Sequence, residues 1–239
     1  MENEFDKIAS EYEAWHEDAV GVSGFNRDYF YERKVNDIQY ILNKQKISHP
    51  STILDFGCGI GDLDPYLRGR FPDSSIYGVD VSEESIQIAK EKQKAHNIEY
   101  SIYDTDWKSS AQQRQFDTGF DLVVASVVFH HITEQEKPSA LEYINAHMKL
   151  GGYLFVFEHN PYNPVTRLIF NKADRPVDKN AELIRSVTLK RLLTKCGFQV
   201  LLCDYSIFFP KFLGAFIRLE RYMKRIPIGG QYCILAKKL

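Results

Sequence analysis

The sequence predicts an α/β protein built on a doubly wound, mostly parallel sheet of seven strands. One observation is a short apolar run, Ile53-Leu54-Asp55-Phe56, which ends in glycines and is followed by a helix-like stretch. A buried parallel strand that turns into a helix has this pattern. The second observation is that strand-like and helix-like segments alternate along the chain. They end in a final strand, Gln231 to Ala236, which we expect to be antiparallel.

Length, charge and cysteine usage limit the class of protein. A chain of 239 residues is long enough for one sizeable core, and 30 Lys and Arg against 32 Asp and Glu argue against nucleic acid as an obligatory partner. The four cysteines stand in no metal-ligand spacing, so we expect no metal site. The N-terminus has no apolar signal core and no segment is apolar enough to cross a bilayer, which predicts a cytoplasmic protein without stable membrane insertion.

Residues 1–48 form a polar, aromatic-rich segment with a helical pattern. Phe5, Ile8, Tyr12 and Trp15 recur at intervals of three and four residues, and a second helix is expected between Tyr29 and Leu42. We predict that this segment is a helical lid and that residues 49–239 form the core.

The loop after the first strand is rich in glycine. Glycines at alternate positions, from Gly57 to Gly61, let a ligand approach the main chain. The next strand-like run ends in Asp80, at the distance where nucleoside-binding folds place an acid on ribose hydroxyls. Asp62 and Asp64 would repel a pyrophosphate, whereas they suit a ligand that has a cationic centre.

Three stretches carry a family resemblance. Residues 55–61, Asp-Phe-Gly-Cys-Gly-Ile-Gly, resemble the first motif of the class I S-adenosylmethionine-dependent methyltransferases, commonly written D/E-x-G-x-G-x-G. Gly78-Val79-Asp80-Val81-Ser82 resembles the acidic second motif, and Leu150-Gly151-Gly152 before a strand is also similar. The resemblance covers roughly residues 50–239. It implies a Rossmann-like methyltransferase fold with S-adenosylmethionine as cofactor.

The resemblance also implies where the methionine part of the cofactor would lie. Asp55, Gly57, Cys58 and Gly59 would line it, and the backbone of Ala125 would lie near the sulfonium.

For the nucleoside, the resemblance implies Asp80 and Val81 at the ribose and Asp104 at the adenine amino group. Asp106, two positions further on, is the rival to Asp104.

The lid would contribute as well. Phe5-Asp6-Lys7-Ile8-Ala9 followed by Tyr12 is similar to the lid opening of many small-molecule methyltransferases. In these enzymes the aromatic side chain closes over the cofactor, and a basic residue such as Arg33 or Lys34 pairs with its carboxylate.

Histidines follow the fourth and fifth predicted strands. His130 and His131 come after Phe120 to Ser126, and His159 comes directly after Glu158 at the end of the fifth strand. Adjacent side chains point opposite ways, so we expect His130 in the core and His131 towards the substrate. His131 and His159 are the candidate general bases, and Glu158 is at hand to orient the His159 ring.

These features favour methyl transfer to an oxygen atom of a small, partly hydrophobic molecule. An Asp/Asn-Pro-Pro-Tyr motif, typical of enzymes that methylate amide or ring-amino nitrogens, is absent after the fourth strand. Insertions near 159–182 and 208–228 would face the substrate, with aromatic side chains walling an apolar pocket: Phe25, Tyr29, Phe30, Phe212 and Phe216. The alternatives are methylation at carbon or nitrogen, an NAD-dependent oxidoreductase and a non-catalytic binding protein. The sequence leaves open whether the protein is a homodimer.

Overall fold

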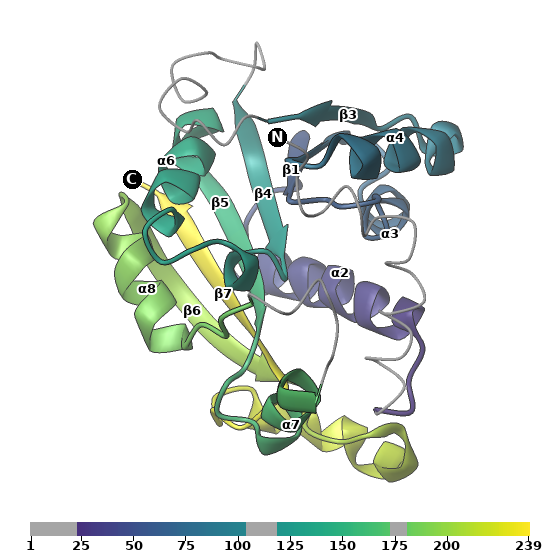
Figure 1. Ribbon diagram of the computed structural model, residues 1–239, viewed down its shortest axis with the longest axis vertical. Helices are drawn as coiled ribbons and strands as arrows, with labels where there is room; N and C mark the ends of the chain where they lie inside the picture. Colours follow the sequence, from purple (N-terminus) through teal and green to yellow (C-terminus); the bar gives the residue numbers. More distant parts are fainter. Residues whose placement is uncertain (1–22, 104–118, 173–180) are drawn as a thin grey trace.

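A mixed sheet with the strand order β3-β2-β1-β4-β5-β7-β6 runs through the computed structural model (Figure 1). The structure describes residues 23–103, 119–172 and 181–239. Within these ranges the sheet has seven strands: β1 (Thr52–Phe56), β2 (Ser75–Asp80), β3 (Glu99–Ile102), β4 (Phe120–Ser126), β5 (Met148–His159), β6 (Phe198–Ser206) and β7 (Gln231–Lys238). The strands from β3 to β5 pair in parallel, and β7 pairs antiparallel with both β5 and β6. The predicted sheet, with its antiparallel last strand, is confirmed.

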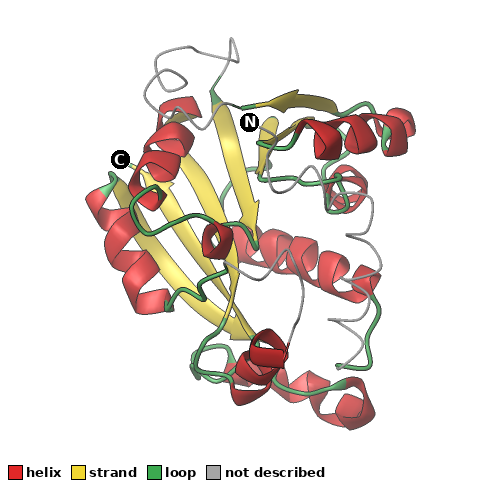
Figure 2. Ribbon diagram, in the orientation of Figure 1, coloured by secondary structure: helices red, strands yellow, loops and turns green. Residues whose placement is uncertain are grey.

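Helices cover both faces of this sheet (Figure 2). The α-helices are α2 (Arg27–Lys44), α3 (Asp64–Arg70), α4 (Glu83–Lys92), α6 (Lys137–His147), α7 (Pro164–Lys172), α8 (Ser186–Lys195) and α9 (Glu220–Met223). The 3₁₀ segments are η1 (Lys94–His96), η2 (Phe129–His131) and η4 (Lys211–Leu219). Local signals explain where some helices begin, since the side chains of Asn26 and Ser82 accept from backbone N–H groups in the first turns of α2 and α4.

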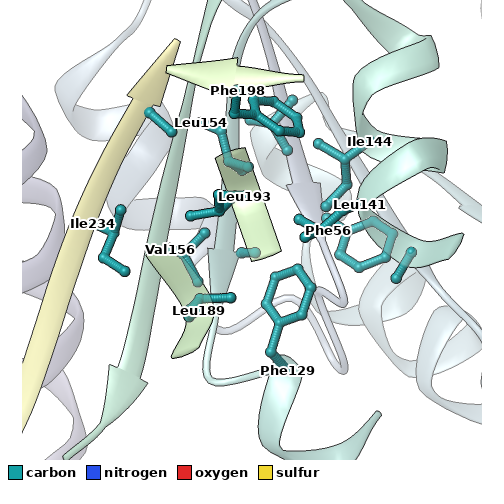
Figure 3. Close-up of a cluster of buried hydrophobic side chains, with 14 of the residues drawn as sticks. Phe56, Phe129, Leu141, Ile144, Leu154, Val156, Leu189, Leu193, Phe198 and Ile234 are labelled. Atoms are coloured by element: carbon teal, nitrogen blue, oxygen red, sulfur yellow. The ribbon is translucent and has the colours of Figure 1, made fainter. Parts of the chain in front are cut away.

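Alternation along the strands divides the core into two layers. Leu54 and Val123 point to the layer that contains α6 and α8, which Figure 3 shows. Ile53 and Leu122, the neighbours of these residues in sequence, point to the layer that contains α2 and α3. Strands buried on both faces are therefore apolar at consecutive positions, as the sequence predicted for the fourth strand.

The second half of the predicted lid is α2, which packs against the sheet through Val35, Ile38, Ile41 and Leu42. Ion pairs connect α2 to the late insertion, where Arg33 lies 2.5 Å from Glu220 and Lys224 lies 2.9 Å from Asp37. Residues 1–22 lie outside the described part of the chain. That the segment closes over a ligand remains a prediction.

Two segments of the chain differ from the sequence-based expectation. The helix expected from Lys211 to Tyr222 is mostly the 3₁₀ segment η4, with non-helical dihedrals at Leu213. Helix α7 was not predicted, although Pro164 at its first position is a recognised start signal and Asn163 accepts from Thr166 N–H.

The helices of the described ranges include none that is long and apolar enough to span a membrane. The four cysteines are free thiols.

The packing of α2 can be tested with Ile38→Ala, because Ile38 is fully buried between α2 and the sheet. We expect the substitution to lower the free energy of unfolding by about 2–5 kcal/mol, through lost burial and the cavity left behind. Leu150→Ala is the control, since Leu150 is 81% exposed and should change stability by only about 0.5 kcal/mol. Urea denaturation measures both, and equal effects would contradict the packing described here.

Candidate active site

The carboxyl ends of β1 and β4 meet at the centre of the sheet edge. Open α/β sheets bind ligands outside the carboxyl ends of their strands, where the strand order reverses, and here that point lies between β1 and β4. Because side chains alternate along a strand, Asp55 and Ser126 share the face on which Ile53 and Val124 pack towards α2. The same face receives Lys34 from α2.

The glycine-rich loop after β1 is held against the neighbouring strands. The backbone N–H groups of Gly57 and Cys58 both donate to the carbonyl of Val79 at the end of β2. Gly57 has a φ of +71°, and a Cβ there would lie 2.6 Å from a methyl carbon of Val128. Only glycine therefore lets the loop after β1 approach the loop after β4 so closely.

Asp80 at the end of β2 organises the same loop. Its carboxylate accepts from the N–H of Gly59 at 2.8 Å and from the N–H of Ser82 at 3.0 Å. Asp80 thus lies at the carboxyl edge beside the glycines, as predicted. Val81, half-buried, follows it directly.

The two acids that follow the loop, Asp62 and Asp64, both interact with other protein groups. Asp62 is paired with Lys92 at 2.5 Å and with Arg27 at 3.4 Å. Asp64 is fully buried and accepts from the hydroxyl of Tyr100 at 2.7 Å. Protein groups therefore engage both acids, and the interpretation in which these two charges favour a cationic ligand stays a prediction.

Asp64 has a second role beneath the loop, where it hydrogen-bonds with Asp55. Burial raises the pKa of Asp64 to about 7, although the hydrogen bonds from Tyr100 and Asp55 oppose the shift. Burial and the neighbouring Asp64 raise the pKa of Asp55 well above its ordinary value. The hydrogen bond between them raises the pKa of Asp55 and lowers that of Asp64, so Asp55 is the residue that donates its proton within the pair.

Lys34 crosses from α2 into the site. Its ammonium group donates to the hydroxyl of Ser126 at 2.7 Å, and its side chain is buried. Burial lowers the pKa of Lys34 to about 8, while the charges of Asp55 and Glu158 act in the opposite direction. The ammonium is therefore charged at pH 7 and loses its proton within reach of mild alkaline conditions.

Glu158 at the end of β5 shapes the turn after β4. One carboxylate oxygen accepts from the N–H of Phe129 at 2.6 Å, and the other lies 2.8 Å from Nδ1 of His130. Burial lowers the pKa of His130 to about 3. The ring is therefore neutral and donates its Nδ1–H to Glu158.

The contact between Glu158 and His130 affects the prediction that a histidine is the general base. His130 is buried as expected, but Glu158 orients His130 rather than His159. Alternation explains the difference, since Glu158 continues the face of Val156 on which Phe129 packs, and His159 points the other way.

The candidate bases His131 and His159 both lie close to His130. The ring centroids of His131 and His130 are 3.9 Å apart, and those of His159 and His130 are 5.5 Å apart. The His159 ring also contacts Phe170 of α7. Burial, together with His130, lowers the pKa of His131 well below its ordinary value, so His131 is neutral at pH 7.

The turn between β4 and η2 contains a strained residue. Val127 has a φ of +62°, in the left-handed region that β-branched residues rarely adopt, at a cost of about 1–3 kcal/mol. Its N–H donates to the carbonyl of Phe157. This conformation lies between Ser126, which reaches Lys34, and Val128, which packs over Gly57.

The polar loop after β5 has a structural use that the sequence did not reveal. Asn160 is fully buried and donates to the carbonyls of Pro227 and Gly229. Asn163 donates to the carbonyl of Ile228. These side chains hold the start of the first insertion to the end of the second, so their polarity does not by itself indicate a substrate site.

Some site residues were missed or cannot be placed. Sequence reasoning missed Ser126, Tyr100 and Gln93, which donates to the carbonyl of Gly61. Strand alternation could have indicated Ser126, because it continues the face of Leu122 and Val124. Three predicted or rival residues lie outside the described part of the chain: Tyr12, Asp104 and Asp106.

The comparisons with known proteins agree with this geometry. A family model described as a methyltransferase domain matches residues 25–202. The chain is 27% identical over 161 residues to TehB of Haemophilus influenzae, described as a S-adenosyl-L-methionine-dependent methyltransferase, with 60% of this chain and 52% of TehB covered. An uncharacterized methyltransferase of Schizosaccharomyces pombe is 34% identical over 128 residues, with 51% and 43% covered. The match thus spans about half the length of these curated relatives.

Solved structures show the same fold. A SAM-dependent methyltransferase from Thermotoga maritima superimposes with a TM-score of 0.67 at 19% identity, covering 99% of this chain and 98% of that one. Magnesium protoporphyrin IX methyltransferase from Synechocystis, with bound S-adenosylhomocysteine, gives a TM-score of 0.61 at 14% identity, covering 98% and 97%.

The site itself fits the cofactor of this fold. A Cβ on Gly59 would meet no atom within 4 Å, which leaves open space beside the loop. Oδ1 of Asp55 is buried and has no hydrogen-bonded partner among the described residues. With a matching family model over most of its length, the chain belongs to the class I S-adenosylmethionine-dependent methyltransferases, and S-adenosylmethionine is its cofactor.

Proposed function

We propose that the protein transfers a methyl group to an oxygen atom of a small, partly hydrophobic molecule, with a histidine as the base. The observation that carries the proposal is the group of histidine rings at the carboxyl ends of β4 and β5, next to the loops of the cofactor site. A hydroxyl nucleophile has to lose its proton, and a neutral imidazole can accept it. The low pKa of His130 and its bond to Glu158 leave His131 and His159 for that role.

The cofactor supplies an electrophilic methyl group on a sulfonium. In the proposal, the Lys34 ammonium pairs with the carboxylate of the methionine part, while Asp55, Gly57, Cys58 and Gly59 line that part. Support for the Lys34 role comes from its position, because its Nζ reaches Ser126 at the end of β4, one residue beyond Ala125.

Asp80 and Val81 are proposed to hold the ribose. The carboxylate of Asp80 already accepts two backbone N–H groups, which fixes its orientation at the loop. Asp104 at the adenine and Tyr12 over the cofactor remain proposals from the family resemblance alone.

An apolar wall for the acceptor is supported on the lid side. The rings of Phe25 and Tyr29 stack at 3.9 Å, and both lie edge-on to Phe30. Phe212, which was expected in the same wall, is 84% exposed and does not contribute to it. A structural neighbour named for a porphyrin acceptor supports a small-molecule substrate, without deciding the acceptor atom.

The alternative of an NAD-dependent oxidoreductase is weakened by the surroundings of Tyr40 and Lys44. Tyr40 and Lys44 have the Tyr-x-x-x-Lys spacing of short-chain oxidoreductases. Tyr40 is half exposed, and Lys44 and Lys224 lie over its ring. Both residues belong to the last turns of α2, whereas Lys34, which reaches the end of β4, lies earlier in the helix.

The acceptor can be found by incubating cell extract with the protein and S-adenosylmethionine labelled in its methyl group. We expect label in a small molecule that partitions into organic solvent, bound through oxygen. Gly57→Val is the matched inactive control, because its side chain would collide with Val128. Label found only in protein or nucleic acid, or on carbon or nitrogen, would contradict the proposal.

The base can be identified on that substrate by His131→Ala and His159→Ala. Replacing the true base should lower turnover by about 100-fold while cofactor affinity is retained. If His131 is the base, its low pKa keeps it unprotonated through neutral pH, so the wild-type rate should be flat around pH 7 and fall only in more acidic solution. His49→Ala, an exposed histidine beside Phe71, serves as the control. Near-wild-type rates in both site variants would exclude a histidine base.

A further inference from the structure

The segment from η4 to α9 exposes large apolar side chains to solvent. Phe212 is 84% exposed, Tyr222 71%, Phe216 48% and Leu219 47%. Phe216, Leu219 and Tyr222 are spaced three residues apart. This spacing aligns Phe216 and Leu219 on one side of the 3₁₀ segment η4, and Tyr222 follows in α9. We call these four residues, with the exposed cations described next, the η4–α9 surface.

Cations flank these apolar groups. Lys211, Arg218 and Arg221 are exposed, and the guanidinium of Arg221 lies 4.6 Å from the centre of the Tyr222 ring. Glu220 is the only acid between residues 207 and 230, and it is buried and paired with Arg33. The whole chain has a net charge of −2, so this positive charge is concentrated locally.

The surface is fixed to the rest of the molecule. One oxygen of Glu220 accepts from the N–H groups of Phe208 and Phe209, and the other faces Arg33 of α2. The N–H of Lys211 donates to the carbonyl of Ser23. With its inner side held in this way, the segment keeps its aromatic side chains directed outwards.

We propose that the η4–α9 surface docks on an anionic lipid bilayer. Aromatic and aliphatic side chains in a band flanked by Lys and Arg are what an interfacial segment needs, because the apolar groups enter the headgroup boundary and the cations contact anionic headgroups. Charge complementarity selects this occupant. A second copy of the chain would place the same positive charges opposite one another, which is repulsive.

Docking would also orient the active site. The Arg33–Glu220 pair joins the surface to the residue that precedes Lys34 in α2. Helix α2 would therefore lie close to the bilayer, from which a partly hydrophobic acceptor could enter. The docking itself does not depend on the acceptor, so it can be tested without any methyl-transfer assay.

The test is co-sedimentation of the full chain with vesicles of phosphatidylcholine alone or of phosphatidylcholine with phosphatidylglycerol. We expect binding to the anionic vesicles that weakens at about 0.5 M salt, where charges are screened beyond a few ångströms, and much weaker binding to the neutral vesicles. Phe212→Ser should weaken binding by about tenfold or more, because it removes the most exposed apolar group. Leu150→Ser is the matched control, since Leu150 is equally exposed but lies at the start of β5.

The charge contribution is tested by Arg218→Glu, with Arg191→Glu on α8 as the matched control. Arg218→Glu should weaken binding to anionic vesicles by about fivefold or more, whereas Arg191→Glu should not. Thermal unfolding and titration with S-adenosylmethionine verify that each variant is folded. Absence of wild-type binding to anionic vesicles, or equal binding by Phe212→Ser, overturns the proposal. A dimer that Phe212→Ser dissociates, without vesicle binding, would assign the surface to self-association instead.

Discussion

The arrangement of the site depends on one buried ammonium group, that of Lys34. A charged group removed from water needs compensating partners, and Lys34 has the Ser126 hydroxyl together with the fields of Asp55 and Glu158. These partners come from the ends of β1, β4 and β5, so the cation connects α2 to the strands that form the centre of the sheet edge.

Much of the fold could be predicted from the sequence, because it follows from local patterns. Apolar runs that end in glycine or acidic residues define β1 and β2, and the continuous apolar run from Phe120 to Ser126 has the bounds of β4. The glycine-rich loop and Asp80 were recognisable for the same reason. The glycines that permit the backbone conformation of the loop, and the spacing from the loop to Asp80, are both visible in a short stretch of sequence.

The remaining features depend on contacts between residues far apart in sequence. The partner of Glu158 is 28 residues away at His130, which adjacency in the sequence could not indicate, and the more obvious neighbour was His159. Asn160 and Asn163 lie in an insertion that we expected to face the substrate, but their partners lie in the turn at residues 227–229. Likewise, the exposure of Phe212, which we expected in the wall of an apolar pocket, depends on how Glu220 fastens η4 and α9 to α2.

The most direct test of the account is the affinity for S-adenosylmethionine, measured by calorimetry between about pH 7 and pH 9.5. Lys34 is charged below its pKa of about 8, so pairing with a carboxylate is complete there and is lost as the pH rises through that value. We expect the dissociation constant of the wild type to rise towards tenfold per pH unit above pH 8. The cofactor's own amino group also titrates, but it does so equally for Lys34→Arg, whose guanidinium stays charged, so the wild type should lose more affinity than this variant. Identical pH dependence in the two proteins, together with unchanged affinity in Lys34→Met, would contradict the central role of Lys34.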